Sequence, residues 1–168
     1  MLGAGSPLLA ACGSDNEDGD PESVLPGGPT TAGLVRVSMD TASGELVFSP
    51  DRIRIRPGET VEWVVESAGH STTAYHPANN TTYQSRIPDA ADPWNSGLLA
   101  KKGDRFQLTF AEEGIYHYYC IPHEGAGMVG AIVVGSPREG GATAPVQGEV
   151  SEAARRKLEK LIAWAKSL

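Results

Sequence analysis

Cys120, His123 and Met128 follow the spacing Cys-x2-His-x4-Met and bring a thiolate, an imidazole and a thioether onto one short segment. The two sulfur ligands favour Cu(I), and imidazole also suits Cu(II), so two His and one Cys with a long axial Met serve both oxidation states. Zinc also binds Cys and His, but Met is a poor zinc ligand. A lone Cys-x2-His is more typical of a small core cysteine. The additional methionine makes copper the predicted metal.

A trigonal copper site needs a second histidine, and this segment contains only one. In the strand that ends at Cys120, side chains alternate, so Tyr116, Tyr118 and Cys120 share one face while His117 and Tyr119 share the other. If Cys120 points towards a metal, His117 points outward, and we predict that it is an exposed strand histidine. Tyr119 is then either an outward strand tyrosine or part of a docking surface or electron path.

The remaining histidines, His70 and His76, both follow a strand expected over residues 59–66. His70 comes directly after Gly69, in a loop position from which a side chain can reach another loop at the same end of the fold. His76 lies farther along, after residues 71–75, which have the pattern of the next strand. We therefore favour His70 as the second imidazole ligand, with His76 as the alternative.

Between residues 33 and 135 the chain consists of short runs rich in β-branched and aromatic residues, separated by turn signals such as Pro50, Pro57 and Gly114. This pattern predicts the strands of a β-sandwich or barrel in one domain. No long amphipathic helix is indicated in this part. The strands are expected over residues 34–37, 46–48, 53–55, 61–65, 106–110, 116–120 and 129–134.

The other cysteine, Cys12, lies in the segment LAACG of residues 9–13, which resembles the lipobox of bacterial lipoproteins. Residues 1–12 contain no Lys or Arg and only a short apolar run, so we interpret them as a truncated lipoprotein-type signal. Residues 13–32 are rich in Gly, Pro, Asp, Ser and Glu, which predicts a flexible acidic tether. We expect an exported protein, periplasmic or on the cell surface, with a membrane anchor at Cys12 and no disulfide to Cys120.

After the strand-rich part, residues 136–150 are again rich in Gly, Ala and Pro and are expected to be a linker. Residues 151–168 then show an apolar stripe at the helix period, with Ser151 as N-cap, and predict an amphipathic helix. Five basic and two acidic side chains give this helix a local charge of +3. It could lie on an anionic membrane or hold a redox partner. Alternatively, its apolar stripe packs on the sandwich or self-associates.

The whole chain of 168 residues is acidic, with 14 Lys plus Arg against 21 Asp plus Glu, a net charge of −7 and a pI near 5.0. This balance argues against nucleic acid as a partner and favours basic docking surfaces on other proteins. No apolar stretch has the length of a membrane span. No Ser-His-Asp arrangement, phosphate loop or paired carboxylate is recognisable, so we predict no enzymatic activity.

Residues 114–130 (GIYHYYCIPHEGAGMVG) and 57–63 (PGETVEW) resemble the aromatic strand, the ligand loop and a further strand of plastocyanin-type cupredoxins, the blue copper proteins. Halocyanins and other membrane-tethered plastocyanin-like proteins are similar in layout. The resemblance implies an all-β, antiparallel Greek-key β-sandwich over residues 33–135 with one copper at one end. It implies His70, Cys120, His123 and Met128 as the ligands.

Members of that family exchange electrons largely through the exposed edge of the ligand that corresponds to His123, ringed by small residues such as Gly125 and Ala126. Ser71 departs from the pattern, because plastocyanins typically have Asn after the first ligand. The favoured function is a one-electron carrier between membrane-associated redox protein donors and acceptors outside the cytoplasm. The alternative is a module that delivers or buffers copper.

Overall fold

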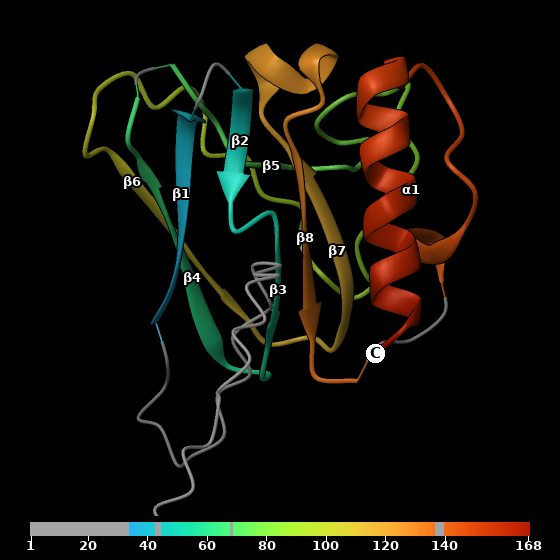
Figure 1. The fold of residues 1–168 in the computed structure, drawn as a ribbon. Helices are drawn as coiled ribbons and strands as arrows, with labels where there is room; N and C mark the ends of the chain where they lie inside the picture. Colours follow the sequence, from blue (N-terminus) through green and yellow to red (C-terminus); the bar gives the residue numbers. More distant parts are fainter. Residues whose placement is uncertain (1–33, 43–44, 68, 137–139) are drawn as a thin grey trace, which may run out of the picture.

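The structure, a computed structural model, describes residues 34–42, 45–67, 69–136 and 140–168 (Figure 1). Residues 1–32, for which a truncated signal with Cys12 and an acidic tether were predicted, lie outside the described residues. In chain order the elements are β1 (Leu34–Ala42), β2 (Glu45–Ser49), β3 (Arg52–Ile55), β4 (Glu59–Val65), β5 (Thr73–Ala74), β6 (Arg105–Phe110), β7 (Gly114–Tyr119), the 3-10 helix η1 (Ile121–Ala126), β8 (Val129–Val134), the 3-10 helix η2 (Gly141–Thr143) and the helix α1 (Glu152–Lys166).

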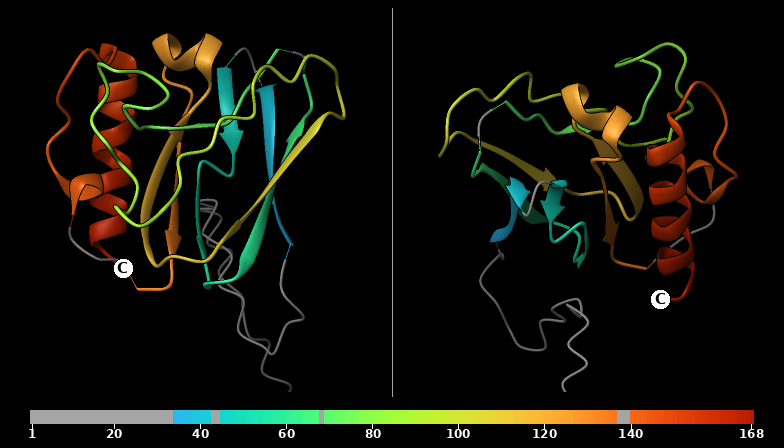
Figure 2. Two further views of the ribbon diagram at one scale, coloured as in Figure 1. Left: turned by 180° about the vertical axis from the view of Figure 1, so that it is seen from behind. Right: turned by 45° about the horizontal axis from the view of Figure 1, so that its top comes forward.

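The strands form two four-stranded sheets, in the orders β2-β1-β4-β6 and β3-β8-β7-β5, which face each other as a sandwich (Figures 1 and 2). This architecture confirms the predicted cupredoxin sandwich. It differs from the expected pattern in that β1 runs parallel to β4 and β3 parallel to β8. The reason is the crossover of the chain: β3 joins the other sheet after the β1–β2 hairpin, so β4 returns beside β1 in the same direction.

The core between the sheets follows from alternation along each strand, which sends every second side chain inward. Val61, Trp63 and Val65 of β4 and Tyr116 and Tyr118 of β7 all belong to one buried cluster. Trp63 is at its centre, because its ring contacts four other aromatic rings, one of them Tyr118 at 5.4 Å between centroids. This cluster also includes Cys120 and Met128, so the predicted ligands lie at the edge of a rigid core.

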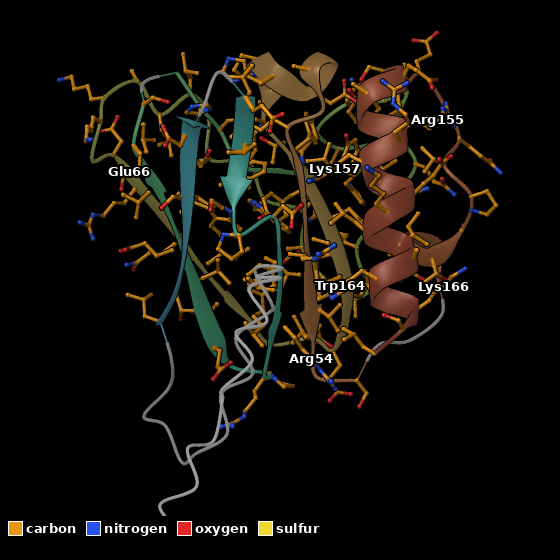
Figure 3. All side chains as sticks on the ribbon, in the orientation of Figure 1. Arg54, Glu66, Arg155, Lys157, Trp164 and Lys166 are labelled. Carbon is orange, nitrogen blue, oxygen red and sulfur yellow. The ribbon has the colours of Figure 1, made fainter. Side chains whose placement is uncertain are left out.

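Helix α1 packs on the outer face of the β3-β8-β7-β5 sheet, beside β8 and β7 (Figure 1). Its buried stripe contacts the outward residues of β8 in two clusters, one with Val129 and Ala131 and one with Val133. The described structure thus selects packing on the sandwich among the alternatives for this helix. Among its basic side chains Lys166 is exposed, whereas Arg155 donates to the carbonyl oxygens of Val146 and Gly148; Figure 3 labels both residues. The stripe consists of Ala154, Leu158, Leu161, Ile162 and Ala165.

Because this outer face is covered, one prediction is wrong and one of the alternatives for Tyr119, the docking surface, is excluded. His117 is completely buried and not an exposed strand histidine, and Tyr119 is only 4% exposed and does not form a docking surface. Alternation places both residues on the outer face as expected, but α1 and the segment after Tyr75 cover that face. Neither ring nitrogen of His117 has a hydrogen-bond partner among the described residues. Burial, together with the nearby Arg86 guanidinium, lowers the pKa of His117 to about 3.

The segment that was expected to be a linker packs against the domain in its described part, residues 140–150. Arg86 is almost fully buried and donates to the carbonyl oxygens of Ala142, Ala144 and Pro145 at 3.1 to 3.2 Å. Val146 is buried with α1 in one cluster. These contacts hold the chain along the outer face and fix the direction from which α1 begins.

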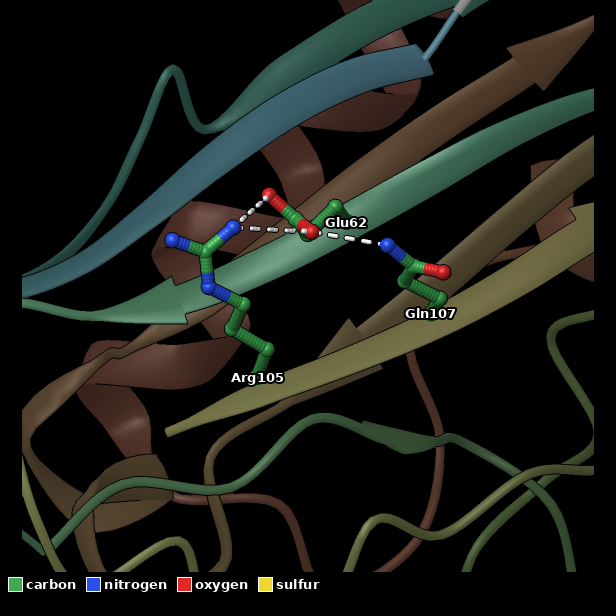
Figure 4. A network of polar contacts seen from close by, with 3 residues as sticks. All are labelled: Glu62, Arg105 and Gln107. Atoms are coloured by element: carbon green, nitrogen blue, oxygen red, sulfur yellow. Dashed lines mark hydrogen bonds and ion pairs between the residues drawn. The ribbon is translucent and has the colours of Figure 1, made fainter. Parts of the chain in front are cut away.

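The outer face of the other sheet is polar and carries a buried carboxylate, Glu62, shown in Figure 4. Arg105 donates to both carboxylate oxygens, at 3.1 and 3.3 Å, and Gln107 donates to one of them at 2.7 Å. Because Glu62 and Gln107 are directly paired across β4 and β6, the network fixes the register of the edge strand.

Candidate metal centre

Two segments that are distant in the sequence, the loop after β4 and the loop between β7 and β8, meet at one end of the sandwich. His70 lies in the loop after β4, where backbone hydrogen bonds with Leu99 hold it in place. Cys120 directly follows β7, and His123 lies in η1, a tight helix that begins at Ile121 and has Pro122 in its first turn. Gly127 ends η1 in the left-handed region, at φ +90°, which favours glycine and lets the chain turn into β8.

The side chains of His70, Cys120 and His123 converge with their ligand atoms within 4.8 Å of one another. His70 Nδ1 lies 3.2 Å from His123 Nδ1. Cys120 Sγ lies 3.7 Å from His70 Nδ1 and 3.4 Å from His123 Nδ1. A metal ion at roughly 2.0 Å from each nitrogen and roughly 2.3 Å from the sulfur fits inside a triangle of these dimensions. The arrangement therefore suits a trigonal metal centre.

Hydrogen bonds around the triangle orient the histidine and the thiol. Ser67 Oγ lies 3.2 Å from His70 Nε2, which leaves Nδ1 facing the centre. The backbone N–H of Ser71 donates to Cys120 Sγ at 3.3 Å, and the Ser71 hydroxyl accepts from the N–H of Ile121 at 2.7 Å. Ser71 thus connects the His70 loop to the Cys120 loop through its backbone and its side chain.

The ionisation of these groups suits metal binding at neutral pH. Burial and the neighbouring His123 lower the pKa of His70, and burial lowers the pKa of His123, so both imidazoles are neutral. Burial raises the pKa of the Cys120 thiol, an effect that the Ser71 N–H opposes. A metal must therefore displace the thiol proton, and binding is expected to weaken as pH falls.

Met128 lies just before β8 and is buried in the same core cluster as Cys120. Its backbone closes the ligand loop: the N–H of Cys120 donates to the Met128 carbonyl, and the N–H of Met128 donates to the His123 carbonyl, both at 3.1 Å. His76 lies outside the triangle, and its Nδ1 accepts from the backbone of Ala78. His117 is also outside it, buried under the outer face.

Sequence reasoning missed the residues that support the ligand loop from outside. Glu124 is buried, its carboxylate accepts from the Tyr75 hydroxyl at 3.2 Å, and its carbonyl accepts from the Ser151 hydroxyl at 3.2 Å. No sequence signal links Tyr75 or Ser151 to the loop, because both are far from it along the chain. The only hint was the charge of Glu124 within an otherwise small and apolar loop.

Residues 35–135 match the family model of copper binding proteins of the plastocyanin/azurin family. Plastocyanin from Nostoc punctiforme is 35% identical over 107 residues, which cover 62% of this chain and 76% of that protein. Pseudoazurin from Methylorubrum extorquens is 31% identical over 113 residues, covering 66% of this chain and 68% of that protein.

The refined crystal structure of pseudoazurin from Methylobacterium extorquens AM1 gives a TM-score of 0.62 at 27% identity and covers 79% of this chain and 98% of the pseudoazurin chain. The matched part, 79% of this chain, is longer than the family segment of residues 35–135, so the structural likeness includes residues outside that segment.

A β-sandwich that gathers two imidazoles and a cysteine thiol at one end defines a cupredoxin, the class of blue copper proteins. The chain belongs to the plastocyanin/azurin family of copper-binding proteins. It is a blue copper electron carrier and, like the members of this family, not an enzyme.

Proposed function

We propose that His70, Cys120, His123 and Met128 ligate one copper ion and that the protein carries single electrons between redox proteins outside the cytoplasm. The observation that supports this most directly is the convergence of two imidazoles and one thiol on a single centre. Met128 follows on the same loop and supplies the weak axial ligand that such centres use to set their potential. Copper, when bound, supplies the Cu(II)/Cu(I) couple.

The protein contributes rigidity and shielding to this couple. His70 and Cys120 are fully buried, and each is fixed by hydrogen bonds to Ser67 or Ser71. Because these side chains are already in place, little has to move when an electron arrives or leaves. His123 is only partly buried, so it is the member of the triangle through which an electron can reach a partner.

The surface around His123 suits brief contact with another protein. Gly125 and Ala126 are exposed and small, so they let a partner approach closely. Ile121 is 49% exposed and Leu98, next to the residue that pairs with His70, is 64% exposed. Exposed apolar side chains grouped at one end are typical of an interaction site. We propose this end as the docking surface for electron donors and acceptors.

We further propose export and a lipid anchor at Cys12, supported by the lipobox-like segment of residues 9–13. The start of β1 pairs with the start of β4, whereas the end of β4 leads to His70. The chain therefore enters the sandwich at the end opposite η1, and a tether would leave the copper end free (Figure 1). Within the described residues no helix has the length and apolarity to cross a membrane. Mass spectrometry of the membrane fraction for a lipidated Cys12 tests this part.

The copper proposal is tested by adding Cu(II) to the metal-free protein and recording the visible spectrum before and after ascorbate. We expect an intense thiolate-to-copper band that disappears on reduction and returns on oxidation. Cys120→Ser removes the thiolate and should abolish the band. A colourless protein that takes up zinc equally well would overturn the carrier function.

A matched pair of histidine variants tests the ligand assignment. His70→Ala opens the trigonal set and should remove the band, whereas His76→Ala, the same change outside the triangle, should leave it intact. The reverse result would transfer the ligand role to His76. Competition with a Cu(I) chelator separates carrier from delivery module, because a carrier keeps its copper through repeated redox cycles and a delivery protein releases it.

A further inference from the structure

Helix α1 contacts the ligand loop directly, in addition to covering the sheet. The Ser151 hydroxyl caps the helix by accepting from the N–H of Ala154 at 3.1 Å. The same hydroxyl donates to the backbone carbonyl of Glu124 at 3.2 Å. One oxygen atom therefore joins the first turn of α1 to the residue that follows His123.

A second contact is steric and lies at Gly127, the residue directly after η1. A Cβ atom built on Gly127 would lie 3.3 Å from the carbonyl oxygen of Ala153 and 3.4 Å from its Cβ. The ligand loop thus passes so close to the first turn of α1 that only glycine fits without displacement. Gly127 is also the residue that turns the chain towards Met128.

Glu124 is held from three directions. Its carbonyl accepts from Ser151 and also from the N–H of Gly127, at 2.8 Å. Its buried carboxylate accepts from Tyr75, whose ring lies under α1 in the same cluster as Leu158. Since His123 and Met128 flank this stretch of the loop, fixing Glu124 limits how far either can move. The buried stripe of the helix and the ion pair between Lys157 and Asp51, which directly precedes β3, hold the helix in place.

From these contacts we propose that α1 is a positioning element of the metal centre and that Ser151 is the positioning residue that holds the ligand loop through the Glu124 carbonyl. The part of this inference that concerns copper rests on the function proposed above. The part that concerns the rigidity of the ligand loop does not depend on copper, because the contacts of Ser151 and Glu124 join protein atoms alone.

The test compares the full chain with four variants in the metal-free form by hydrogen–deuterium exchange of the backbone amides of residues 121–128. Ser151→Ala removes the cap of α1 and the hydrogen bond to the Glu124 carbonyl. Loss of the bond to Glu124, worth about 1 kcal/mol, should speed amide exchange in the loop about five-fold. Ser151→Asp keeps the cap but has no proton to donate to Glu124, so it should match Ser151→Ala. Ser151→Thr keeps both bonds and should match the wild type.

Ser167→Ala is the matched control, because it makes the same change at the opposite end of α1, where the hydroxyl donates to the Trp164 carbonyl. It should leave exchange of the ligand loop unchanged. Wild-type exchange in Ser151→Asp would show that Ser151 only caps the helix and would overturn the proposal. Exchange in Ser167→Ala as fast as in Ser151→Ala would also overturn it.

With copper bound, Ser151→Ala should displace the reduction potential and the thiolate-to-copper band relative to the wild type and Ser167→Ala. An unchanged potential and band would refute positioning of the metal centre. A wild type that shows no such band at all would instead refute the copper proposal and would leave the exchange result in the metal-free protein standing.

Discussion

His117→Leu is expected to remove the part of the loss of folding stability at low pH that is due to the protonation of His117. His117 is fully buried beneath α1 and the segment after Tyr75, and neither of its ring nitrogens has a partner in the described structure. Burial, with a contribution from Arg86, lowers its pKa to about 3. A leucine of similar size removes two unbonded nitrogens, which is neutral or stabilising near neutral pH.

The magnitude follows from the pKa of His117 in the folded and unfolded chains. Because the folded-state pKa lies below the unfolded value of 6.5, the unfolded chain binds the proton first. Stability is therefore lost as pH falls from about 6.5 towards about 3, at about 1.4 kcal/mol for each pH unit. Between about pH 7.5 and about pH 5 the loss from His117 is about 2 kcal/mol. His117→Leu should lack this loss.

Urea unfolding of the metal-free wild type and variant at both pH values measures the effect, and taking the difference between the two proteins cancels the contributions of His70 and His123. His117→Gln is the companion variant: it does not titrate, so it should lose the same pH dependence while being less stable than His117→Leu. Equal pH dependence in wild type and variants would refute the assignment of a buried, neutral histidine at this position.

Three other outcomes are expected. Met128→Gln should retain copper and shift the reduction potential, because the axial ligand tunes the metal more than it holds it; a redox titration measures the shift, and loss of copper would contradict an axial role. Ser71→Ala should lower the free energy of unfolding by about 1 kcal/mol in a urea titration, since the N–H of Ile121 loses its acceptor. The Ser71→Ala variant should keep its thiolate-to-copper band, because the Ser71 N–H still donates to Cys120 Sγ. Loss of the band would show that the Ser71 hydroxyl, and not the N–H, holds Cys120 in place. Leu158→Ala should cost about 2 to 5 kcal/mol by the same titration, and a change below about 0.5 kcal/mol would show that the buried stripe does not hold α1.

The fold class followed from local patterns. Alternation with period two in the strands and an apolar stripe at the helix period in α1 depend only on neighbouring residues, so they can be read along the chain. The spacing of Cys120, His123 and Met128 has the same local character, because all three belong to one loop closed by its own backbone hydrogen bonds. These features were therefore accessible without coordinates.

Long-range packing decided what alternation could not. The period-two rule gave the correct face for His117 and Tyr119, but whether a face meets solvent depends on what packs over it. Here α1 and the chain after Tyr75 cover that face, so the exposure predicted for His117 was wrong and Tyr119 cannot form a docking surface. The parallel pairing of β1 with β4 is likewise a property of the crossover between sheets.

The types of the metal-binding side chains could be read along the chain, because the chemistry of thiolate, imidazole and thioether depends on the residues alone. Only the tertiary structure brought His70 within 3.2 Å of His123 and placed the Ser151 hydroxyl against the Glu124 carbonyl. These contacts join segments far apart in the chain, so their geometry depends on how the two sheets and α1 pack, which no short sequence pattern encodes.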